Sequence, residues 1–481
     1  MKLFNTMKLL ALAACTLVST GLMAHSQTSH KDSRDRDFDA VQRFVNSKRT
    51  ISLEEKDSNL SIAGDIRVNW MHITESVAKH KMRNVDNGAR ESELINDADP
   101  SVGVSSVSSD GTEYKPNEFE IEFNLYVDYI CDRAWGVAWL QFENDAGIDE
   151  NIHPRRSDDV NGMFGSGNCD GLCLKKAYIG YNICADGCQR FDIEIGRRPL
   201  YTIFESRVQF NSRFDGILLK YSRPVESWGD FYWNFGGFVV DQRSQHFAYA
   251  TELGLLNICD CGLSLRYSFI DWLSALDNGY TRARGESGNI KKPYGVRFRV
   301  SQISGSYTFQ PECLCMPVKV YAAYLHNHDA TAFSAGSGLT AVSTNGRKLN
   351  DAWYAGAIIG KVCHECDWSF EVNFQKVEAQ ALPDADVSGI GSERNILGET
   401  FTANGRGYTN YMGWFAEGLY ALTDNLTLNA RFEYSQEADK DVTANGLPAT
   451  VTQGNDVEQP AVGDRAKHKY TMFRLQAIYA F

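Results

Sequence analysis

The stretch Glu118-Phe-Glu-Ile-Glu-Phe-Asn-Leu-Tyr-Val-Asp-Tyr129 alternates between two kinds of side chain. Its odd positions are apolar, and nearly all its even positions are charged or polar. Rolled into a helix, the segment would have no coherent apolar face. In a strand, successive side chains point to opposite faces, so the same residues separate into an apolar side and a polar side. The sequence therefore predicts a β-strand with one side in water and the other in apolar surroundings.

The same alternation recurs along most of the chain and predicts an all-β fold. We expect strands at 60–74, 117–130, 135–146, 174–183, 190–197, 212–222, 229–240, 247–258, 262–272, 295–309, 317–327, 351–362, 367–377, 408–422, 425–436 and 468–481. That makes about sixteen, an even number of strands long enough to cross a bilayer at a tilt. The pattern favours a transmembrane antiparallel up-and-down β-barrel.

The connections between these segments are of two kinds in rotation. One kind is tight and usually carries cysteine, as in 131–133, 184–188, 259–261, 313–315 and 363–366. The other kind is long and rich in Gly, Asp, Asn and Ser. A barrel in an outer membrane has short periplasmic turns on one rim and longer loops on the other. We therefore expect the cysteine-bearing turns to face the periplasm.

Composition leaves few other classes open. The net charge of −13 argues against nucleic acid as a partner, because a phosphate binder needs a basic footprint. Beyond the first residues there is no apolar run of about 18 residues, as a membrane-spanning helix would need. The mean hydropathy of −0.34 still fits a barrel, since only every second residue of a strand meets lipid.

The N-terminal residues predict two further segments. Residues 1–24 resemble a secretory signal peptide, with Lys2, Lys8 and an apolar run at 9–14. The alternative is a lipoprotein signal ending at Cys15, which would then be lipidated. Residues 25–58 form a periplasmic segment with a short amphipathic helix over 37–48, and 59–481 form the barrel.

The last strand places apolar side chains on one face and ends in Phe481. Outer-membrane barrels of diderm bacteria typically end in such a strand, whose terminal Phe is read by the assembly machinery. The chain resembles the porins of that class, in architecture over about 60–481 and in sequence only at this strand. The resemblance implies an outer-membrane location, contact with lipid and the barrel-assembly machinery, and a homo-oligomer, a trimer. It also implies passive diffusion of small hydrophilic solutes or ions, without a cofactor.

The cysteines admit three interpretations: disulfide bonds, a metal site, or reduced and inert thiols. Zinc usually takes four ligands, whereas each cysteine pair lies in a separate turn. Cys184 with Cys188, and Cys169 with Cys173, could close small loops; one-residue spacings strain self-pairing, which favours other partners. The disulfide candidates are Cys131, Cys169, Cys173, Cys184, Cys188, Cys259, Cys261, Cys313, Cys315, Cys363 and Cys366. The cysteine-rich turns resemble the major outer-membrane proteins of chlamydia-like bacteria. This likeness implies an alternative function: a structural or adhesive barrel that is cross-linked to other envelope proteins.

Charged residues on the polar sides of the strands are the candidates for lining a channel. They are Arg67, Glu118, Glu120, Glu122, Asp128, Asp192, Glu194, Arg266, Arg297, Arg299, Lys319, Glu371, Arg431, Glu433 and Arg474. They suggest an acidic wall around 118–128 facing a basic wall around 266–299. The third outward loop, 197–207, would fold inward as in porins, with Arg198, Glu205 and Arg207 controlling selectivity.

Motifs for catalysis are absent from the sequence. There is no Gly-x-Ser-x-Gly elbow, phosphate-binding loop or dinucleotide fingerprint in a suitable context. We therefore expect a protein that is not an enzyme.

Overall fold

We describe the protein from a computed structural model. The description covers residues 51–55, 58–77, 112–114, 117–145, 172–186, 189–241, 246–273, 298–312, 314, 316–330, 342–343, 347–383, 386–391, 409–439, 443–444 and 468–481. The predicted leader, the predicted helix over 37–48 and Cys15 lie outside these residues. Among the described residues, no helix is long and apolar enough to cross a membrane.

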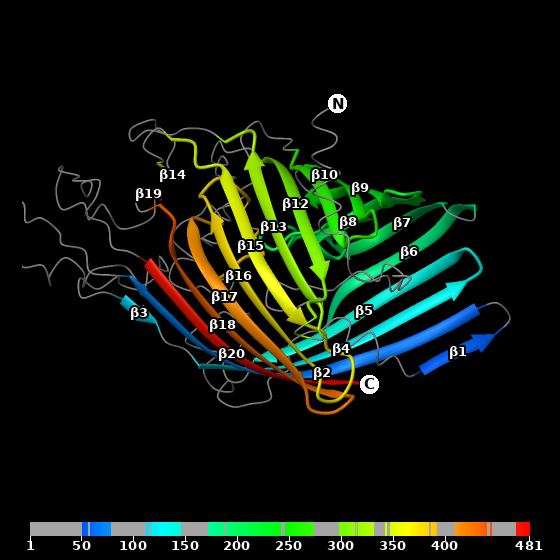
Figure 1. Cartoon of the computed structure of the whole chain (residues 1–481), viewed down its shortest axis with the longest axis horizontal. Coiled ribbons are helices and arrows are strands. Elements are labelled where there is room, and N and C mark those ends of the chain that lie inside the picture. Colours follow the sequence, from blue (N-terminus) through cyan, green and yellow to red (C-terminus); the bar gives the residue numbers. More distant parts are fainter. Residues whose placement is uncertain are drawn as a thin grey trace, which may run out of the picture.

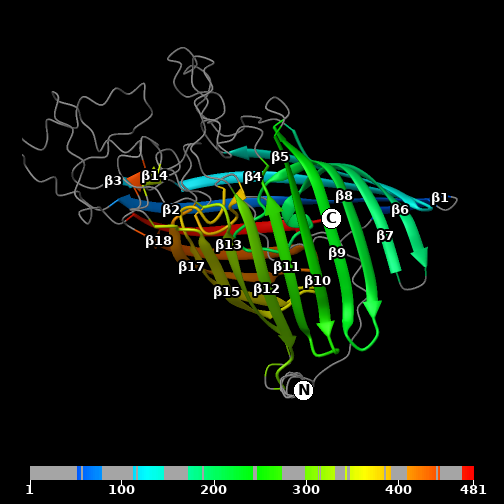
Figure 2. The same ribbon diagram turned by 90° about the horizontal axis from the view of Figure 1, so that it is seen from above.

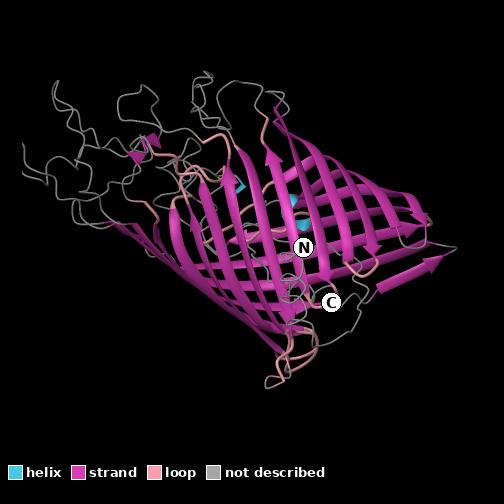
Figure 3. Ribbon diagram, turned by 45° about the horizontal axis from the view of Figure 1, so that its top comes forward, coloured by secondary structure: helices cyan, strands magenta, loops and turns pink. Residues whose placement is uncertain are grey.

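Sixteen strands form one closed antiparallel barrel (Figures 1 and 3). They are β2 (Ser58–Val77), β4 (Asn117–Cys131), β5 (Ala134–Asp145), β6 (Cys173–Asp186), β7 (Gln189–Pro199), β8 (Arg213–Val225), β9 (Gly229–Asp241), β10 (His246–Ile258), β11 (Leu263–Asp271), β12 (Arg299–Phe309), β13 (Val318–Asn327), β15 (Asp351–Gly360), β16 (Trp368–Val377), β17 (Tyr411–Ala421), β18 (Leu426–Glu437) and β20 (His468–Ala480). Each pairs with its neighbours along the chain, and β20 pairs with β2, from Ala480↔Asp65 to His468↔Val77. The ring therefore has no open edge.

Four short strands and one short helix accompany the ring. β1 (Ile51–Glu55) and β3 (Thr112–Tyr114) extend the sheet at β2, while β14 (Val342–Ser343) pairs with β19 (Thr443–Ala444). The 3-10 helix η2 (Leu200–Thr202) begins the connection after β7. The predicted barrel of sixteen strands is confirmed, with the ends of each strand within four residues of the expected ones, whereas the four short strands were not predicted.

The connections sort onto two rims because consecutive strands run in opposite directions. The turn rim carries the connections after β4, β6, β8, β10, β12, β15 and β17. The turn after β4 shows why such corners are tight: Asp132 adopts a φ of 51°, which Asp tolerates better than most residues. The loop rim carries the connections after β2, β5, β7, β9, β11, β13, β16 and β18. All of these except the one after β9 span ten residues or more.

The alternation seen in the sequence sets the two faces of the barrel. On β4, Phe119 and Ile121 point outward and are each 43% exposed, whereas Glu120 and Glu122 point inward and are 7% and 5% exposed. An unexpected part of the interior is apolar. Side chains such as Phe204, Phe210, Phe214 and Trp272 pack together in a cluster within the ring. The interior therefore contains both a polar lining and an apolar core.

Candidate functional site: the barrel interior

A polar cluster lies on the inner faces of β2 and β4. The Asp65 carboxylate lies 2.6 Å from Arg67 Nε and accepts hydrogen bonds from Asn124 and Tyr126, at 3.0 and 2.9 Å. Asn124 also donates to Glu122 at 2.6 Å. All five side chains are at most 5% exposed. Arg67 pairs with Asp65, while Glu122 accepts from the Asn124 amide, so the cluster holds two carboxylates and one guanidinium.

A second cluster joins β17, β18 and β20. Arg431 reaches Glu417 at 2.6 Å and Glu433 at 2.7 Å, and its guanidinium lies 4.0 Å from the centre of the Phe415 ring. Arg474 lies 3.6 Å from Glu417. Two arginines and two glutamates balance in charge, as buried ions require. This network ties three neighbouring strands together without a net charge.

A third cluster lies on β7 and β8, next to the loop rim. Glu194 accepts a hydrogen bond from Arg198 and lies 3.3 Å from Lys220 Nζ. The Arg198 guanidinium stacks 4.3 Å from the centre of the Tyr178 ring. Arg198 and Lys220 therefore both lie around the Glu194 carboxylate.

The segment 200–212, here called the constriction segment, connects β7 to β8 by passing through the interior of the barrel (Figure 2). The Glu205 N–H donates to the Glu252 carboxylate on β10 at 2.9 Å, and Gln302 on β12 donates to the Glu205 carbonyl at 2.5 Å. Gln375 on β16 donates to the Arg207 carbonyl at 3.2 Å. These partners belong to strands well separated around the ring, so the segment extends across the interior.

Apolar packing fixes the constriction segment. Pro199, with φ −68° and ψ 138°, presets the extended backbone that leads into η2. The rings of Phe204 and Phe210 lie 5.2 Å apart, and those of Phe214 and Phe238 5.4 Å apart. All four rings are at most 4% exposed. The segment is therefore held by a hydrophobic core that lies inside the barrel.

The segment 386–391, here called the clasp segment, comes from the connection after β16 and meets the constriction segment. Ser212 N–H donates to the Asp386 carboxylate at 3.0 Å, and Asn211 N–H donates to the Asp386 carbonyl at 3.1 Å. Ser388 Oγ donates to the Gln209 carbonyl at 3.0 Å. Two connections that are distant in sequence thus form one assembly across the interior.

Asp386 is the ionisable group in this contact. Its side chain is fully buried, and burial raises the pKa of the carboxyl from 3.8 to about 7, against the lowering effect of hydrogen bonds from Ser212 and Phe210. The clasp is therefore built around an acid that titrates near neutrality.

Most predicted lining residues are on the inner face. Arg67, Glu120, Glu122, Arg198, Arg266, Arg431, Glu433 and Arg474 point into the barrel, and Glu205 and Arg207 belong to the constriction segment. Arg207 lies 3.5 Å from Glu371 and stacks 5.3 Å from the centre of the Tyr321 ring. Arg297 and the side chain of Glu118 lie outside the described residues. The role of all these residues in selectivity stays a prediction.

The prediction for Arg299 is wrong. Its side chain is on the outer face, is 49% exposed and pairs with Asp329 at 2.5 Å. The adjacent Phe298 and Val300, 8% and 1% exposed, point inward instead and join the apolar cluster. Assigning polar residues to the inside failed here because the interior beside the constriction segment is apolar. The basic wall expected at 266–299 is therefore not formed by the described residues, and the inner charges are mixed in sign around the ring.

Asp65 and three further inner acids were not predicted as site residues. Glu252 accepts hydrogen bonds from Glu205 N–H and Ser268, and Glu417 belongs to the network of Arg431. Both occupy inward positions of alternating strands, so strand parity could have found them. Asp386 lies in a connection without periodicity, and its role depends on a contact between distant segments. No sequence signal indicated it.

The seven described cysteines are free thiols, so no disulfide bond forms among them. Six of them lie at the turn rim, and Cys173 begins β6 at the loop rim. Cys169, Cys188, Cys313 and Cys315 lie outside the described residues, so one cysteine of each predicted small loop is not described. Within the described part of the chain, no group of three or more His, Cys, Asp or Glu side chains is placed to hold a metal ion.

Phe481 completes the seam between the two ends of the barrel. Its N–H and C=O each bond to Gly64, both at 2.9 Å, and its ring stacks 6.3 Å from that of Phe123. A Cβ at Gly64 would lie 2.5 Å from Phe481 Cζ, so this close approach requires glycine. The proposed reading of Phe481 by an assembly machinery stays a prediction.

No protein-family model and no curated protein sequence matches this chain. Among solved structures, it is similar to Salmonella typhi OmpF in complex with daunomycin, with 9% identity and a TM-score of 0.42, covering 90% of this chain and 100% of that one. It is also similar to Pseudomonas putida OprB at high pH, with 11% identity and a TM-score of 0.43, covering 87% and 94%. It is also similar to outer-membrane expressed OmpT of Vibrio cholerae, with 10% identity and a TM-score of 0.36, covering 90% of this chain and 100% of that one. With identities this low, the function of the chain rests on its own geometry.

Proposed function

We propose that the chain is a porin in the outer membrane of a diderm bacterium, through which small hydrophilic solutes or ions diffuse passively. The observation that carries the proposal is the closed ring of sixteen antiparallel strands with large apolar side chains outside and charged side chains inside. A barrel is one of the two structures that satisfy every backbone hydrogen bond within lipid.

The outer face supports placement in a bilayer. Large apolar side chains project from strands all around the ring and are 36–67% exposed. Examples are Trp70 on β2, Ile217 on β8, Ile303 on β12 and Phe370 on β16. In water, a continuous belt of this kind would be a strong aggregation liability. Within hydrocarbon it is favourable, so we place the belt in the membrane, with the turn rim in the periplasm.

The interior supports passage with selection. The constriction segment narrows the interior, and Arg207 on it pairs with Glu371 on the facing wall. The lining charges are nearly all buried against one another, so the proposed route is narrow. Selection then follows from the width of the route and the field of its charged groups, without a chemical step.

Planar-bilayer recording tests the proposal. Purified, folded protein should give stepwise, ohmic conductance, and protein unfolded by heat should give none. A barrel that is folded, as judged by its heat-dependent mobility in electrophoresis, but never conducts would rule the proposal out.

Reversal potentials in a salt gradient test the selectivity part. Arg207→Gln should shift the reversal potential toward cation preference, because a positive charge leaves the constriction. Arg197→Gln is the matched control: its side chain is on the outer face, paired with Asp215 at 2.7 Å. Equal reversal potentials for both variants would argue against a selective role for Arg207.

A further inference from the structure

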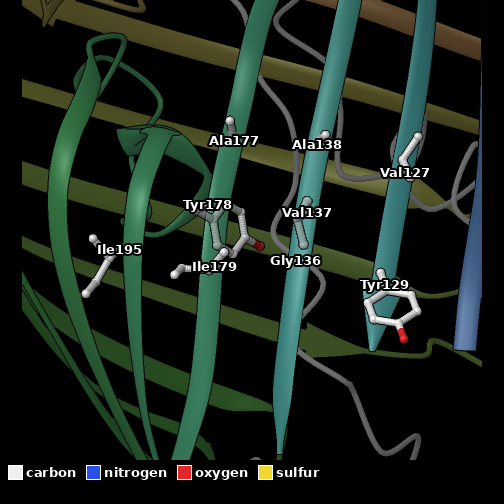
Figure 4. A pocket seen from close by; sticks show the side chains of 9 residues that line it. All are labelled: Val127, Tyr129, Gly136, Val137, Ala138, Ala177, Tyr178, Ile179 and Ile195. Carbon is white, nitrogen blue, oxygen red and sulfur yellow. The ribbon is translucent and has the colours of Figure 1, made fainter. Parts of the chain in front are cut away.

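An apolar hollow of about 480 Å³ lies on the outer face of β4, β5, β6 and β7 (Figure 4). Its floor is made of small residues that lie side by side in the sheet, with Ala138 paired to Ala177 and Gly136 on the same strand. An added Cβ at Gly136 would meet no atom within 4 Å, so the space above it is open. The hollow is a break in an otherwise bulky apolar belt.

Larger side chains form the walls of the hollow. Tyr129, opposite Gly136 in the register, bounds it on β4, and Ile179 and Ile195, which are also register partners, bound it on β6 and β7. These three side chains are 47%, 67% and 47% exposed. The hollow is shallow and open on the side away from the sheet, so an occupant would lie along the outer surface. The hollow therefore has the size and the lining of a site for a hydrocarbon chain.

A cation lies beside the hollow, toward the turn rim. Arg133 stacks 5.3 Å from the centre of the ring of Tyr181, which lies on the outer face two residues from Ile179. Its guanidinium donates to the Ile183 carbonyl, and within the described part of the chain it forms no ion pair. Tyrosines and arginines at this level are typical of the boundary between hydrocarbon and headgroups. The apolar hollow and the adjacent cation match the two parts of an anionic phospholipid.

We propose that this face binds one anionic phospholipid of the leaflet at the turn rim, with an acyl chain in the hollow and its phosphate at Arg133. The proposal rests on the proposed function, because it needs the barrel to lie in a bilayer. A second copy of the chain is the other occupant to consider. A stable protein interface buries on the order of 1,000 Å² or more, which is more than a hollow lined by nine residues offers to a second copy. The positive charge of Arg133 beside the hollow favours a phosphate instead.

Native mass spectrometry of the purified barrel tests the site, with phosphatidylglycerol and phosphatidylethanolamine mixed in equal amounts in the detergent micelle. The wild type should retain one phosphatidylglycerol. Gly136→Val fills the hollow and should lose it. Gly237→Val is the matched control, since Gly237 also lies on the outer face with nothing within 4 Å of an added Cβ, but on β9. Should Gly136→Val fail to fold, Ala138→Leu fills the same floor.

Arg133→Gln tests the headgroup. The variant should still bind a lipid, but the ratio of bound phosphatidylglycerol to bound phosphatidylethanolamine should fall about fivefold, as expected for the loss of one arginine near a membrane surface. Equal lipid retention by wild type and Gly136→Val would overturn the site, and so would equal loss in Gly237→Val. A change in subunit number in Gly136→Val without lipid loss would assign the hollow to a second copy.

Conductance of the same preparations separates the two proposals. The hollow lies outside the lumen, so all four hollow and control variants should conduct like the wild type. If the wild type conducts but retains no lipid, the lipid site is refuted and the porin proposal is not. If the wild type retains a lipid but does not conduct, the porin proposal is refuted and the lipid site is not.

Discussion

The clasp between the constriction and clasp segments should loosen as the pH rises. Asp386 is buried with its carboxylate accepting from Ser212 N–H at 3.0 Å, and burial raises its pKa to about 7. When the two segments separate, the carboxyl enters water and regains an ordinary pKa. The neutral form of Asp386 therefore stabilises the closed arrangement relative to the separated one, and the ionised form destabilises it. Replacing Asp386 by Asn keeps the shape and removes the ionisation.

The sign and size follow from the two pKa values. A pKa raised in the closed state means that the clasp is fully stable below about pH 4, weakens as the pH rises through about 7, and changes little above that. The ordinary value of 3.8 and the raised value of about 7 correspond to about 4 kcal/mol, at about 1.4 kcal/mol for each pH unit between them. About 2 kcal/mol of this is lost between pH 5.5 and 8.5, which is about thirtyfold in the opening equilibrium.

Amide hydrogen exchange measures that equilibrium directly. The Asn211 and Ser388 amides donate across the clasp, to the Asp386 and Val208 carbonyls. After correction for the intrinsic effect of pH on exchange, their protection should fall about thirtyfold from pH 5.5 to 8.5 in the wild type. In Asp386→Asn it should stay nearly constant. Strand amides of β17 serve as the internal control, because they are paired in the ring.

Either of two results would count against a role for Asp386 in this pH dependence. If Asp386→Asn lost protection with pH as steeply as the wild type, another group would be responsible. If neither protein lost protection, the segments would be held by contacts that do not depend on the ionisation of Asp386, such as the apolar packing of Val387 and Ile390.

Three further predictions follow from the packing. Phe204→Ala removes from the constriction segment a ring that is 1% exposed, and should destabilise the packing of the segment by about 3–5 kcal/mol. We expect the single-channel conductance to rise. Unchanged conductance would show that the segment does not limit the current. Arg431→Met leaves the buried Glu433 carboxylate without its arginine and should cost about 3–5 kcal/mol. Arg197→Met breaks an exposed pair and should cost less than about 1 kcal/mol. Both costs are read from the temperature at which heating changes the electrophoretic mobility, and equal shifts would contradict the expected difference. Gly64→Ala should displace Phe481 and lower the yield of folded barrel below that of Gly237→Ala, where the space is open; equal yields would refute the need for glycine at the seam.

The strands could be predicted because a single physical rule produces them. A two-residue period in apolarity is visible in the sequence wherever one face meets lipid and the other meets polar groups. The segment of β4 around Glu120 and Glu122 shows it most clearly. Charged residues on such strands, Arg67 and Arg431 among them, were therefore placed correctly on the inner face.

The interior beside the constriction segment could not be predicted in the same way. Its core forms between Phe204, Phe210 and strand residues such as Val300, which are far apart in sequence. This core reverses the usual assignment on β12 and puts Arg299 outside. The contact of Asp386 with Ser212 likewise joins two aperiodic connections, and only the folded barrel brings them together.

The seam between β2 and β20 has a consequence for biogenesis. Asp65 and Ala480 are register partners although their numbers differ by 415. Until β20 pairs with β2, the sheet has two open edges of unpaired amides and carbonyls, and such edges recruit other chains into aggregates. Contacts of this sequence separation also form slowly. Pairing of the thirteen-residue strand β20 with β2 is therefore the step that removes both open edges at once.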